Sequence, residues 1–170
     1  IMTDTIPFRI RNPLLVKGTL HIIAMALPNR KLAVPFYRLR GTKMGKNLGI
    51  GHFVYIEETR PWLVEVGDNV VIGPKTIITA QDGSYHRANP KFKKRYEKVI
   101  IEDNAYIGSG VNIIRGVTIG RNSIIGAGSV VTKSIPPYSL AVGNPARVIK
   151  SVNSMSYEQK ELTILDKKMP

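Results

Sequence analysis

Aliphatic side chains recur at every sixth position through the second half of the chain. The repeat consists of Ile101, Ile107, Ile113, Ile119, Ile125 and Val131. Neither an α-helix, with 3.6 residues per turn, nor a half-buried strand, with strict alternation, produces a period of six. A fixed period of six is typical of a parallel β-helix, in which three short flat faces make one triangular coil. The pattern therefore predicts a β-helix whose repeated residues point into a shared interior.

The same period continues towards the N-terminus in two further runs. Their members are Met44, Ile50, Ile56, Val66, Ile72 and Ile78. Asparagines and glycines between these positions suit the corners of a coil, where a left-handed backbone is needed. The corner candidates are Asn69, Asn104, Asn122, Gly45, Gly51, Gly67, Gly73 and Gly116.

The repeat divides the chain into three parts. Residues 1–42 do not follow it and predict short basic helices that cap the N-terminal end of the coil, since an uncovered coil exposes apolar interior and unpaired backbone. Residues 43–150 form the predicted β-helix, from which a long loop at 81–98 is extruded at a corner. Residues 151–170 contain a capping-box pattern, Ser156 with Gln159, and predict a C-terminal helix over the other end.

Composition narrows the choice of partners and compartment. The chain has 170 residues, no cysteine and a formal net charge of +13. Without cysteine there is neither a disulfide nor a thiol nucleophile, which favours a cytoplasmic setting. Apolar runs are too short for a membrane span. A basic N-terminal segment also suggests weak contact with the inner membrane surface.

The positive charge does not indicate a nucleic-acid partner. One cluster of cations falls in the extruded loop: Lys91, Lys93, Lys94, Arg95 and Lys98. A nucleic-acid module adds exposed aromatics interleaved with the cations, or an element that reads a groove. We identify neither pattern in the sequence.

Three segments carry a resemblance to a known family. They are IGSGVNIIRGVTIG (107–120), IGAGSVVTKSIP (125–136) and GNPARVIK (143–150). The chain resembles the hexapeptide-repeat acyltransferases over roughly 43–150, and most closely the maltose, galactoside and polysaccharide-sugar O-acetyltransferases. The resemblance implies a left-handed parallel β-helix, an exception to the usual right-handed crossover. It also implies a homotrimer with acetyl-CoA in a groove between the β-helices of neighbouring subunits.

The catalytic residue implied by the resemblance is His86, the histidine of the extruded loop. A sugar hydroxyl is a poor nucleophile at neutral pH, and an imidazole can remove its proton as it attacks the thioester. Many relatives carry a threonine-x-histidine-aspartate run at the loop entrance, where this chain has Thr79, Ala80, Gln81 and Asp82. His86 therefore stands a few residues later than in that version.

The residues that the resemblance assigns to acetyl-CoA lie in the same motifs. Gly126, Ala127 and Gly128 let the backbone approach the pantetheine arm. Cations and polar groups flank the phosphates and the adenosine end, where charge-assisted hydrogen bonds are strong. The full set is Tyr106, Ser109, Gly126, Ala127, Gly128, Thr132, Lys133, Arg147 and Lys150, with Tyr106 where relatives usually have a tryptophan over the active site.

The acceptor side is less defined by the sequence. Candidate partners for sugar hydroxyls, or for orienting the histidine, are Tyr55, Glu57, Glu58 and Asp82. The function that follows is acetyl-CoA-dependent O-acetylation of a sugar or of a precursor of a cell-surface polysaccharide. The sugar, the hydroxyl attacked, the acyl length and the groups of the oxyanion site stay open.

Three other functions are compatible with a β-helix. N-acetylation of an amino sugar is the nearest rival. A γ-carbonic-anhydrase-like zinc site needs three histidines at suitable positions, and the chain has only His21, His52 and His86, so we expect no metal. A non-catalytic scaffold that has lost coenzyme A binding is the third alternative.

Overall fold

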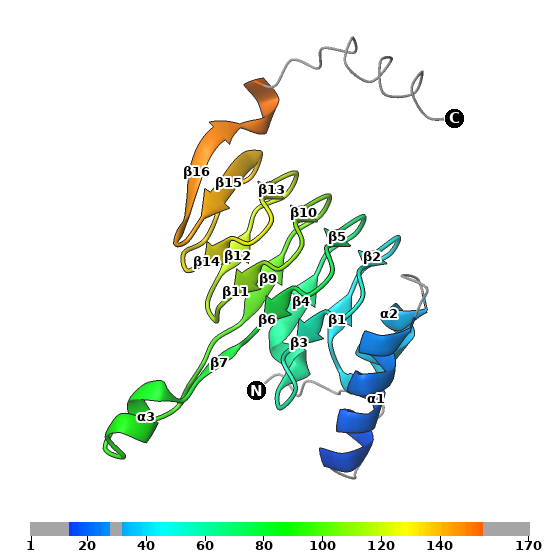
Figure 1. The fold of residues 1–170 in the computed structure, drawn as a ribbon, viewed down its shortest axis with the longest axis vertical. Coiled ribbons are helices and arrows are strands. Elements are labelled where there is room, and N and C mark those ends of the chain that lie inside the picture. Colours follow the sequence, from blue (N-terminus) through cyan, green and yellow to red (C-terminus); the bar gives the residue numbers. More distant parts are fainter. Residues whose placement is uncertain (1–13, 28–31, 155–170) are drawn as a thin grey trace, which may run out of the picture.

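Three parallel sheets form the body of the molecule (Figure 1). The computed structural model describes residues 14–27 and 32–154. The first face contains β1 (Lys43–Met44), β4 (Val64–Val66), β9 (Val99–Ile101) and β12 (Thr118–Ile119). The second contains β2 (Gly49–Ile50), β5 (Val71–Ile72), β10 (Tyr106–Ile107), β13 (Ile124–Ile125) and β15 (Ser139–Gly143). The third contains β3 (Tyr55–Ile56), β6 (Ile77–Ile78), β11 (Asn112–Ile113) and β14 (Val130–Val131).

Consecutive strands of the body belong to the first, second and third faces in turn, as β1, β2 and β3 do and β4, β5 and β6 again. The chain therefore winds as a parallel β-helix. Each strand pairs with the equivalent strand one coil away, as Ile107 of β10 does with Ile72 of β5 and Ile125 of β13. The last residue of nearly every strand in the three faces is almost fully buried, including all six members of the repeat from Ile101 to Val131. This confirms the inward direction of the repeated side chains that the sequence predicts.

The corners correct part of the sequence analysis. Asn69 and Asn104 have φ of 57° and 58°, as predicted for a left-handed corner. The glycines that follow the buried aliphatic residues, however, do not have positive φ: these are Gly45, Gly51, Gly67 and Gly73. A Cβ at Gly73 would lie 2.5 Å from the backbone nitrogen of Ser109 in the next coil. These glycines are needed because successive coils approach closely.

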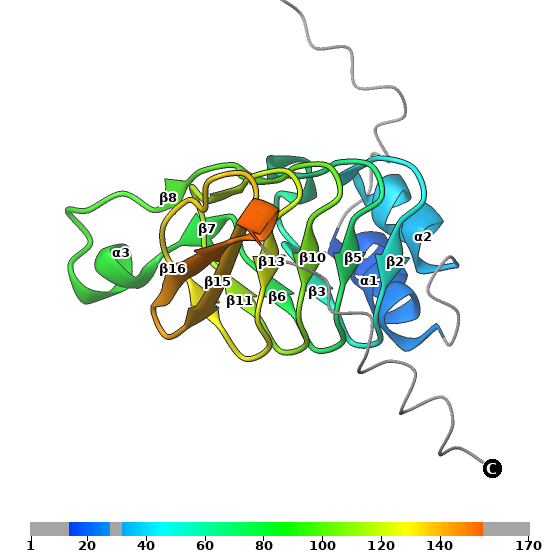
Figure 2. The same ribbon diagram turned by 90° about the horizontal axis from the view of Figure 1, so that it is seen from above.

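Two helices precede the coil and pack against its first turns. They are α1 (Leu14–Ala26) and α2 (Ala33–Arg40), which lie beside β1 in Figure 1 and at the β2 end of the coil in both views (Figures 1 and 2). Buried Tyr37 donates a hydrogen bond of 2.6 Å to the carbonyl of Val54, and the amide of Phe53 donates one of 3.0 Å to the carbonyl of Met25. Among the described residues, no helix combines the length and apolar character needed to cross a bilayer.

The regular coil is interrupted twice and ends in a hairpin. A 3-10 turn, η1 (Pro61–Leu63), precedes β4, as the proline there suggests. Residues 81–98, which we call the arm, contain β7 (Gln81–Asp82), α3 (Ser84–Ala88) and β8 (Arg95–Tyr96), and project away from the coil (Figure 1). After β15 the chain folds back as β16 (Ala146–Ser151), antiparallel to it, and ends in η2 (Val152–Ser154). The C-terminal helix predicted from Ser156 lies outside the described residues.

Candidate active site

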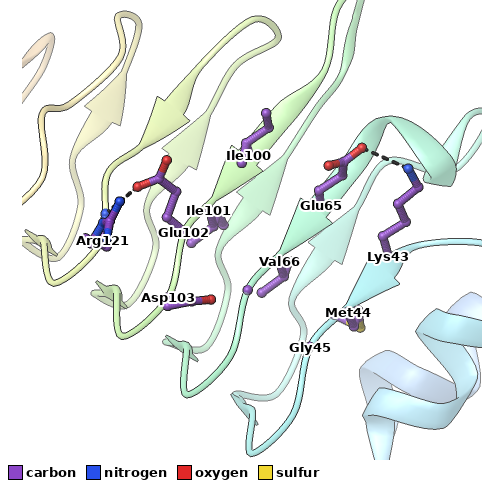
Figure 3. Close-up of a pocket in the computed structure, with 11 residues that line it drawn as sticks. Lys43, Met44, Gly45, Glu65, Val66, Ile100, Ile101, Glu102, Asp103 and Arg121 are labelled. Atoms are coloured by element: carbon purple, nitrogen blue, oxygen red, sulfur yellow. Dashed lines mark hydrogen bonds and ion pairs between the residues drawn. The ribbon is translucent and has the colours of Figure 1, made fainter.

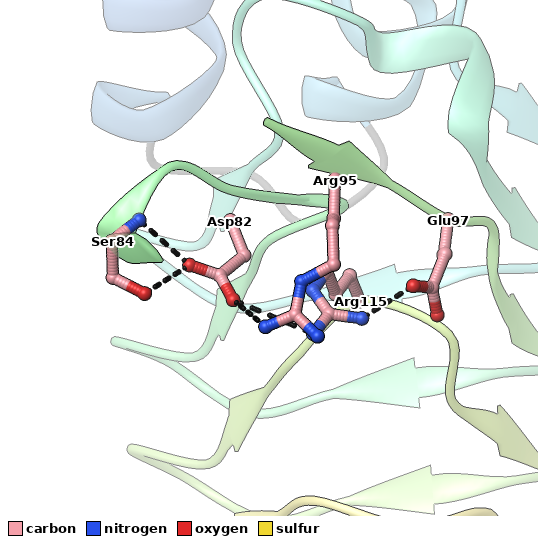
Figure 4. Close-up of polar contacts among 5 residues, drawn as sticks. All are labelled: Asp82, Ser84, Arg95, Glu97 and Arg115. Carbon is pink, nitrogen blue, oxygen red and sulfur yellow. Dashed lines mark hydrogen bonds and ion pairs between the residues drawn. The ribbon is translucent and has the colours of Figure 1, made fainter. Parts of the chain in front are cut away.

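The arm is held at its base by ion pairs around Asp82. Its carboxylate lies 2.7 Å from Arg95 Nη2 across the β7–β8 ladder and 3.4 Å from Arg115 Nη2, which comes from the next coil (Figure 4). The same carboxylate accepts hydrogen bonds from the amide and hydroxyl of Ser84. The bonds from Ser84, followed by that from Arg95, hold the pKa of Asp82 well below its usual range. Asp82 is therefore an anionic anchor and a poor candidate for accepting a proton.

Two further contacts fix the direction of the arm. Arg115, whose side chain is 15% exposed, also pairs with Glu97 (Figure 4). The guanidinium of Arg60 lies 3.8 Å from the ring centroid of Tyr96. Because these contacts join β7 and β8 to two neighbouring coils, the arm leaves the body with a defined orientation.

His86 lies on α3, within the arm, and is partly exposed. Its Nδ1 is 2.7 Å from the carbonyl oxygen of Phe92. A carbonyl oxygen only accepts hydrogen bonds, so Nδ1 carries the proton and donates it. In the neutral ring the lone pair then resides on Nε2, which can accept a proton from a substrate hydroxyl. The contact with Phe92 thus selects the tautomer that a general base requires.

Several predicted coenzyme A residues lie together at the corner between the second and third faces. Ser109 follows β10 and residues 126–128 follow β13, so the two turns occupy adjacent coils. The amide of Gly128 donates a 2.8 Å hydrogen bond to the carbonyl of Ser109, which stacks the turns. Gly128 has φ of +70°, and a Cβ built there would meet nothing within 4 Å. The result is a low, exposed surface of backbone that an extended ligand can approach closely.

The other predicted cofactor residues lie away from that corner. Thr132 and Lys133 follow β14 at the next corner, between the third and first faces, and both are exposed. Arg147 and Lys150 are exposed on β16, which continues the second face through β15. Tyr106 lies on that face too, 50% exposed and in register with Ile124. One chain therefore presents these groups along two corners and the face between β10 and β16.

The structure argues against one predicted acceptor residue. Glu57 is fully buried. Its Oε1 accepts hydrogen bonds from the amide and hydroxyl of Thr59, at 2.9 and 2.7 Å, and its Oε2 accepts one from the amide of Ala80 at 3.0 Å. A carboxylate satisfied in this way is not available to a sugar. Glu57 instead fixes the chain where the arm begins.

The other two acceptor candidates lie near the N-terminal helices. The ring of Tyr55 meets that of His21 edge to face, with centroids 4.9 Å apart. Burial, followed by the charges of Glu57 and Glu58, raises the pKa of Tyr55. Glu58 is partly buried, and a Cβ on Gly18 of α1 would lie 3.6 Å from its Oε1. The structure therefore does not bring Tyr55 and Glu58 together with His86 on the arm.

Sequence reasoning missed the residues that support His86. The sequence analysis did not single out Arg115, which anchors the base of the arm, and Phe92 supplies only its backbone carbonyl. Neither role has a sequence signal, because both depend on how the arm folds back on itself and on the next coil. In the described part of the chain no cluster of three metal-binding side chains occurs.

A hollow of about 540 Å³ runs along the first face (Figure 3). None of the predicted site residues lines it. Glu65 within it pairs with Lys43 at 3.1 Å and with Lys98 at 2.7 Å, and Glu102 accepts a hydrogen bond from the amide of Arg121. The carboxylates of Glu65, Glu102 and Asp103 in the hollow already have partners within the chain, so it does not compete with the arm and the glycine-rich corner as the candidate site.

Comparison with known proteins identifies relatives that share the six-residue repeat. Residues 98–133 match the family described as bacterial transferase hexapeptide (six repeats). The galactoside O-acetyltransferase of Lactococcus lactis is 37% identical over 135 residues, which are 73% of this chain and 61% of that protein. The galactoside O-acetyltransferase of Escherichia coli is 41% identical over 114 residues, which are 64% of this chain and 56% of that protein. The chain thus spans about three fifths of the length of these curated relatives.

A solved structure shares the fold over most of its length. A galactoside acetyltransferase in complex with coenzyme A superposes with a TM-score of 0.65 at 26% identity, covering 94% of this chain and 91% of that one. The six-residue repeat and the glycine-rich corners are typical of a hexapeptide-repeat protein. The chain belongs to the hexapeptide-repeat acyltransferase superfamily.

Proposed function

We propose that the protein is an acetyl-CoA-dependent O-acetyltransferase that acts on a hydroxyl of a sugar or of a polysaccharide precursor. The observation that carries the proposal is His86, whose Nδ1 is bound to the carbonyl of Phe92 so that Nε2 is left as a base. Its position on a firmly anchored arm beside a coil with glycine-rich turns supports the same conclusion. The curated relatives that act on galactosides favour a saccharide acceptor.

In the proposed reaction, Nε2 of His86 removes the proton of the acceptor hydroxyl as the oxygen attacks the thioester carbonyl. The new C–O bond gives a tetrahedral intermediate, whose oxyanion requires a hydrogen-bond donor. Collapse of the intermediate breaks the C–S bond, and the departing thiolate takes the proton from the imidazolium. General base catalysis of this kind contributes roughly 10²–10⁴ in rate.

Acetyl-CoA would lie along the corner that contains Ser109 and Ala127, with its pantetheine amides paired to exposed backbone groups. Lys133, Arg147 and Lys150 would meet the phosphates and adenosine end, helped by Thr132, and Tyr106 would cover the thioester. The exposure of the three cations supports this assignment, since Lys133 and Lys150 can pair with a phosphate and Arg147, which donates to the carbonyl of Ala146 through Nη1, keeps further donors for one. The relative solved with coenzyme A shows that this fold accommodates the ligand in that protein.

We further propose that the coil is left-handed and that the enzyme is a homotrimer. The arm projects away from its own coil (Figure 1), so His86 needs a neighbouring copy to meet a thioester held at the corner of Ala127. The outer surface of the third face supports such an assembly, because Ile77 on β6 is 41% exposed and Ile114 at its edge is 36% exposed. Apolar side chains in that position gain by burial against another copy.

The proposal is tested by turnover. Purified protein is incubated with acetyl-CoA and a panel of neutral, acidic and amino sugars, and release of the coenzyme A thiol is followed with a thiol reagent. We expect acceptor-dependent release and an ester, labile to mild base, on the product. Release that depends on an amino sugar and gives an amide would instead make the enzyme an N-acetyltransferase. Thiol release that no acceptor stimulates would refute sugar acetylation.

A further inference from the structure

The outer part of the arm carries a dense group of cations. Residues 84–96 contain no aspartate or glutamate. The exposed cations there are Arg87, Lys91, Lys93, Lys94 and Arg95. Arg95 pairs with Asp82 at the base, whereas the other four form no ion pair with any residue in the described part of the chain. We call Arg87, Lys91, Lys93 and Lys94 the arm cations.

This clustering is not a general property of the basic surface. The cations around Glu65 on the first face are paired with it, and the hollow there also contains Glu102 and Asp103. The acidic residues closest in sequence to the arm cations, Asp82 and Glu97, are bound by arginines at the base. The arm cations therefore project a positive potential that no neighbouring carboxylate cancels.

Two aromatic rings lie among the arm cations. Tyr85 and Phe92 are 57% and 54% exposed, and their rings meet edge to face with centroids 6.0 Å apart. The guanidinium of Arg95 lies 4.6 Å from the ring centroid of Tyr85. Exposed rings fixed in this way offer apolar surface to a ligand at low entropic cost. His86 follows Tyr85 directly and is bound to the carbonyl of Phe92, so rings, cations and base share one short segment.

We infer that the arm recognises an anionic saccharide, an acceptor that carries carboxylate or phosphate groups beside the hydroxyl to be acetylated. The inference rests on the proposed function, which it narrows from sugars in general to acidic ones. The arm cations attract and pair with the anionic groups, and the faces of Tyr85 and Phe92 pack against the C–H faces of the sugar rings. A saccharide is favoured over an anionic bilayer because the arm cations and the two rings lie in the same short segment as His86, the proposed base, which the acceptor hydroxyl must reach to react.

The inference is tested first by binding, which does not require turnover. The calorimetric ligands are pentagalacturonate for carboxylates, phosphorylated maltopentaose for phosphates and maltopentaose as the neutral control. The arm variant is Lys91→Gln/Lys93→Gln. The matched variant is Lys46→Gln/Arg121→Gln, which removes two exposed cations at the corner between the first and second faces and gives the same net charge.

We expect the arm variant to bind at least one acidic ligand roughly tenfold more weakly than the wild type, whereas the matched variant stays within about twofold. Wild-type affinity should fall with added salt, since exposed charges are screened over about 10 Å at 0.1 M. The acidic ligand that responds identifies whether carboxylate or phosphate is preferred. Equal losses in the two variants, or no loss in either, would overturn the inference.

Two further results separate this inference from the function on which it rests. Acetylation of maltopentaose without binding of either acidic ligand would leave the acetyltransferase intact and overturn the acidic acceptor. Arm-dependent binding of an acidic ligand with no acetylation of any acceptor would uphold recognition and refute the enzyme. Sedimentation of wild-type protein with phosphatidylglycerol vesicles, combined with no binding of the acidic saccharides, would assign the patch to a membrane surface and also overturn the inference.

Discussion

Single side chains in this protein owe their roles to one or two hydrogen bonds. The contact with the Phe92 carbonyl leaves Nε2 of His86 as the ring atom that can accept a proton, and the carboxylate of Glu57 is occupied by the amide of Ala80 and by Thr59. In both cases a hydrogen bond with a backbone group determines whether the side chain can interact with a substrate. The residue types alone do not show that Nε2 of His86 is available and that the carboxylate of Glu57 is not.

Replacement of His86 should separate catalysis from cofactor binding. We expect His86→Ala to lower kcat by at least roughly 10²-fold with the KM for acetyl-CoA little changed, because the base acts in the transition state. Steady-state kinetics with the identified acceptor provide the measurement. His52→Ala is the matched control, since that histidine lies at a corner of the coil. Turnover of His86→Ala within a few-fold of wild type would exclude His86 as the base.

A second histidine should make the stability depend on pH. His21 is buried, and its Nδ1 lies 2.7 Å from Arg40 Nη1, which can only donate to it. Burial and, secondarily, the charge of Arg40 lower the pKa of His21 from 6.5 to about 4. The unfolded chain therefore binds a proton that the folded chain excludes, and stability falls as the pH drops from about 6.5 towards about 4.

The loss over this window is about 3 kcal/mol at most, since one pKa unit corresponds to about 1.4 kcal/mol. Urea unfolding of wild type and of His21→Gln at a series of pH values measures it. The glutamine offers a hydrogen-bond acceptor to Arg40 without titrating, so the variant should have a shallower slope between pH 6.5 and 4. Identical slopes in the two proteins would contradict the assignment of this dependence to His21.

At the scale of the element, close approach of neighbouring coils limits what each corner tolerates. A Cβ at Gly108 would lie 2.5 Å from the backbone nitrogen of Ala127, where no flexible side chain can yield. We expect Gly108→Ala to destabilise the protein by at least about 2 kcal/mol, because backbone has to shift to relieve the overlap. Thermal unfolding provides the measurement.

Gly49→Ala is the matched control for that substitution. The added methyl would meet only side-chain carbons of Val71, at 3.6 and 3.8 Å, which is ordinary contact. Its melting temperature should stay close to that of the wild type. Equal destabilisation by the two substitutions would mean that backbone entropy, and not the spacing of the coils, explains the glycines.

The sequence predicts the elements of the coil well and the arm poorly. Every buried position of the six-residue repeat has the same surroundings in the β-helix. The period alone therefore predicts that Ile101 through Val131 point into the interior. The arm has no sequence repeat, and its orientation depends on contacts of Arg115 and Arg60 with residues distant in sequence. For the same reason the motifs located His86, while its partner Phe92 and the burial of Glu57 became evident only from the fold.

At the scale of the whole molecule, the separation of His86 from the glycine-rich corner has a direct consequence for assembly. If the site forms between copies, light scattering should give a mass of about three chains. Two inactive variants should also complement each other: His86→Ala supplies an intact corner, and Lys133→Glu/Arg147→Glu supplies an intact histidine. Mixed trimers, formed by refolding the two together, should regain measurable turnover. An active monomer, or the absence of any recovery in verified mixed trimers, would place the whole site within one chain.

The ends of the arm meet at its root, where the amide of Glu97 donates a 3.0 Å hydrogen bond to the carbonyl of Ala80. The chain thus leaves the β-helix and rejoins it at almost the same point. The turns of the β-helix before and after the arm therefore do not depend on the length or sequence of the arm. A segment attached in this way can be lengthened, shortened or exchanged during evolution without disturbing the surface proposed to hold the acyl donor. Related enzymes can therefore diverge in acceptor while retaining one donor, and grafting a foreign arm between Ala80 and Glu97 is a rational route to new specificity.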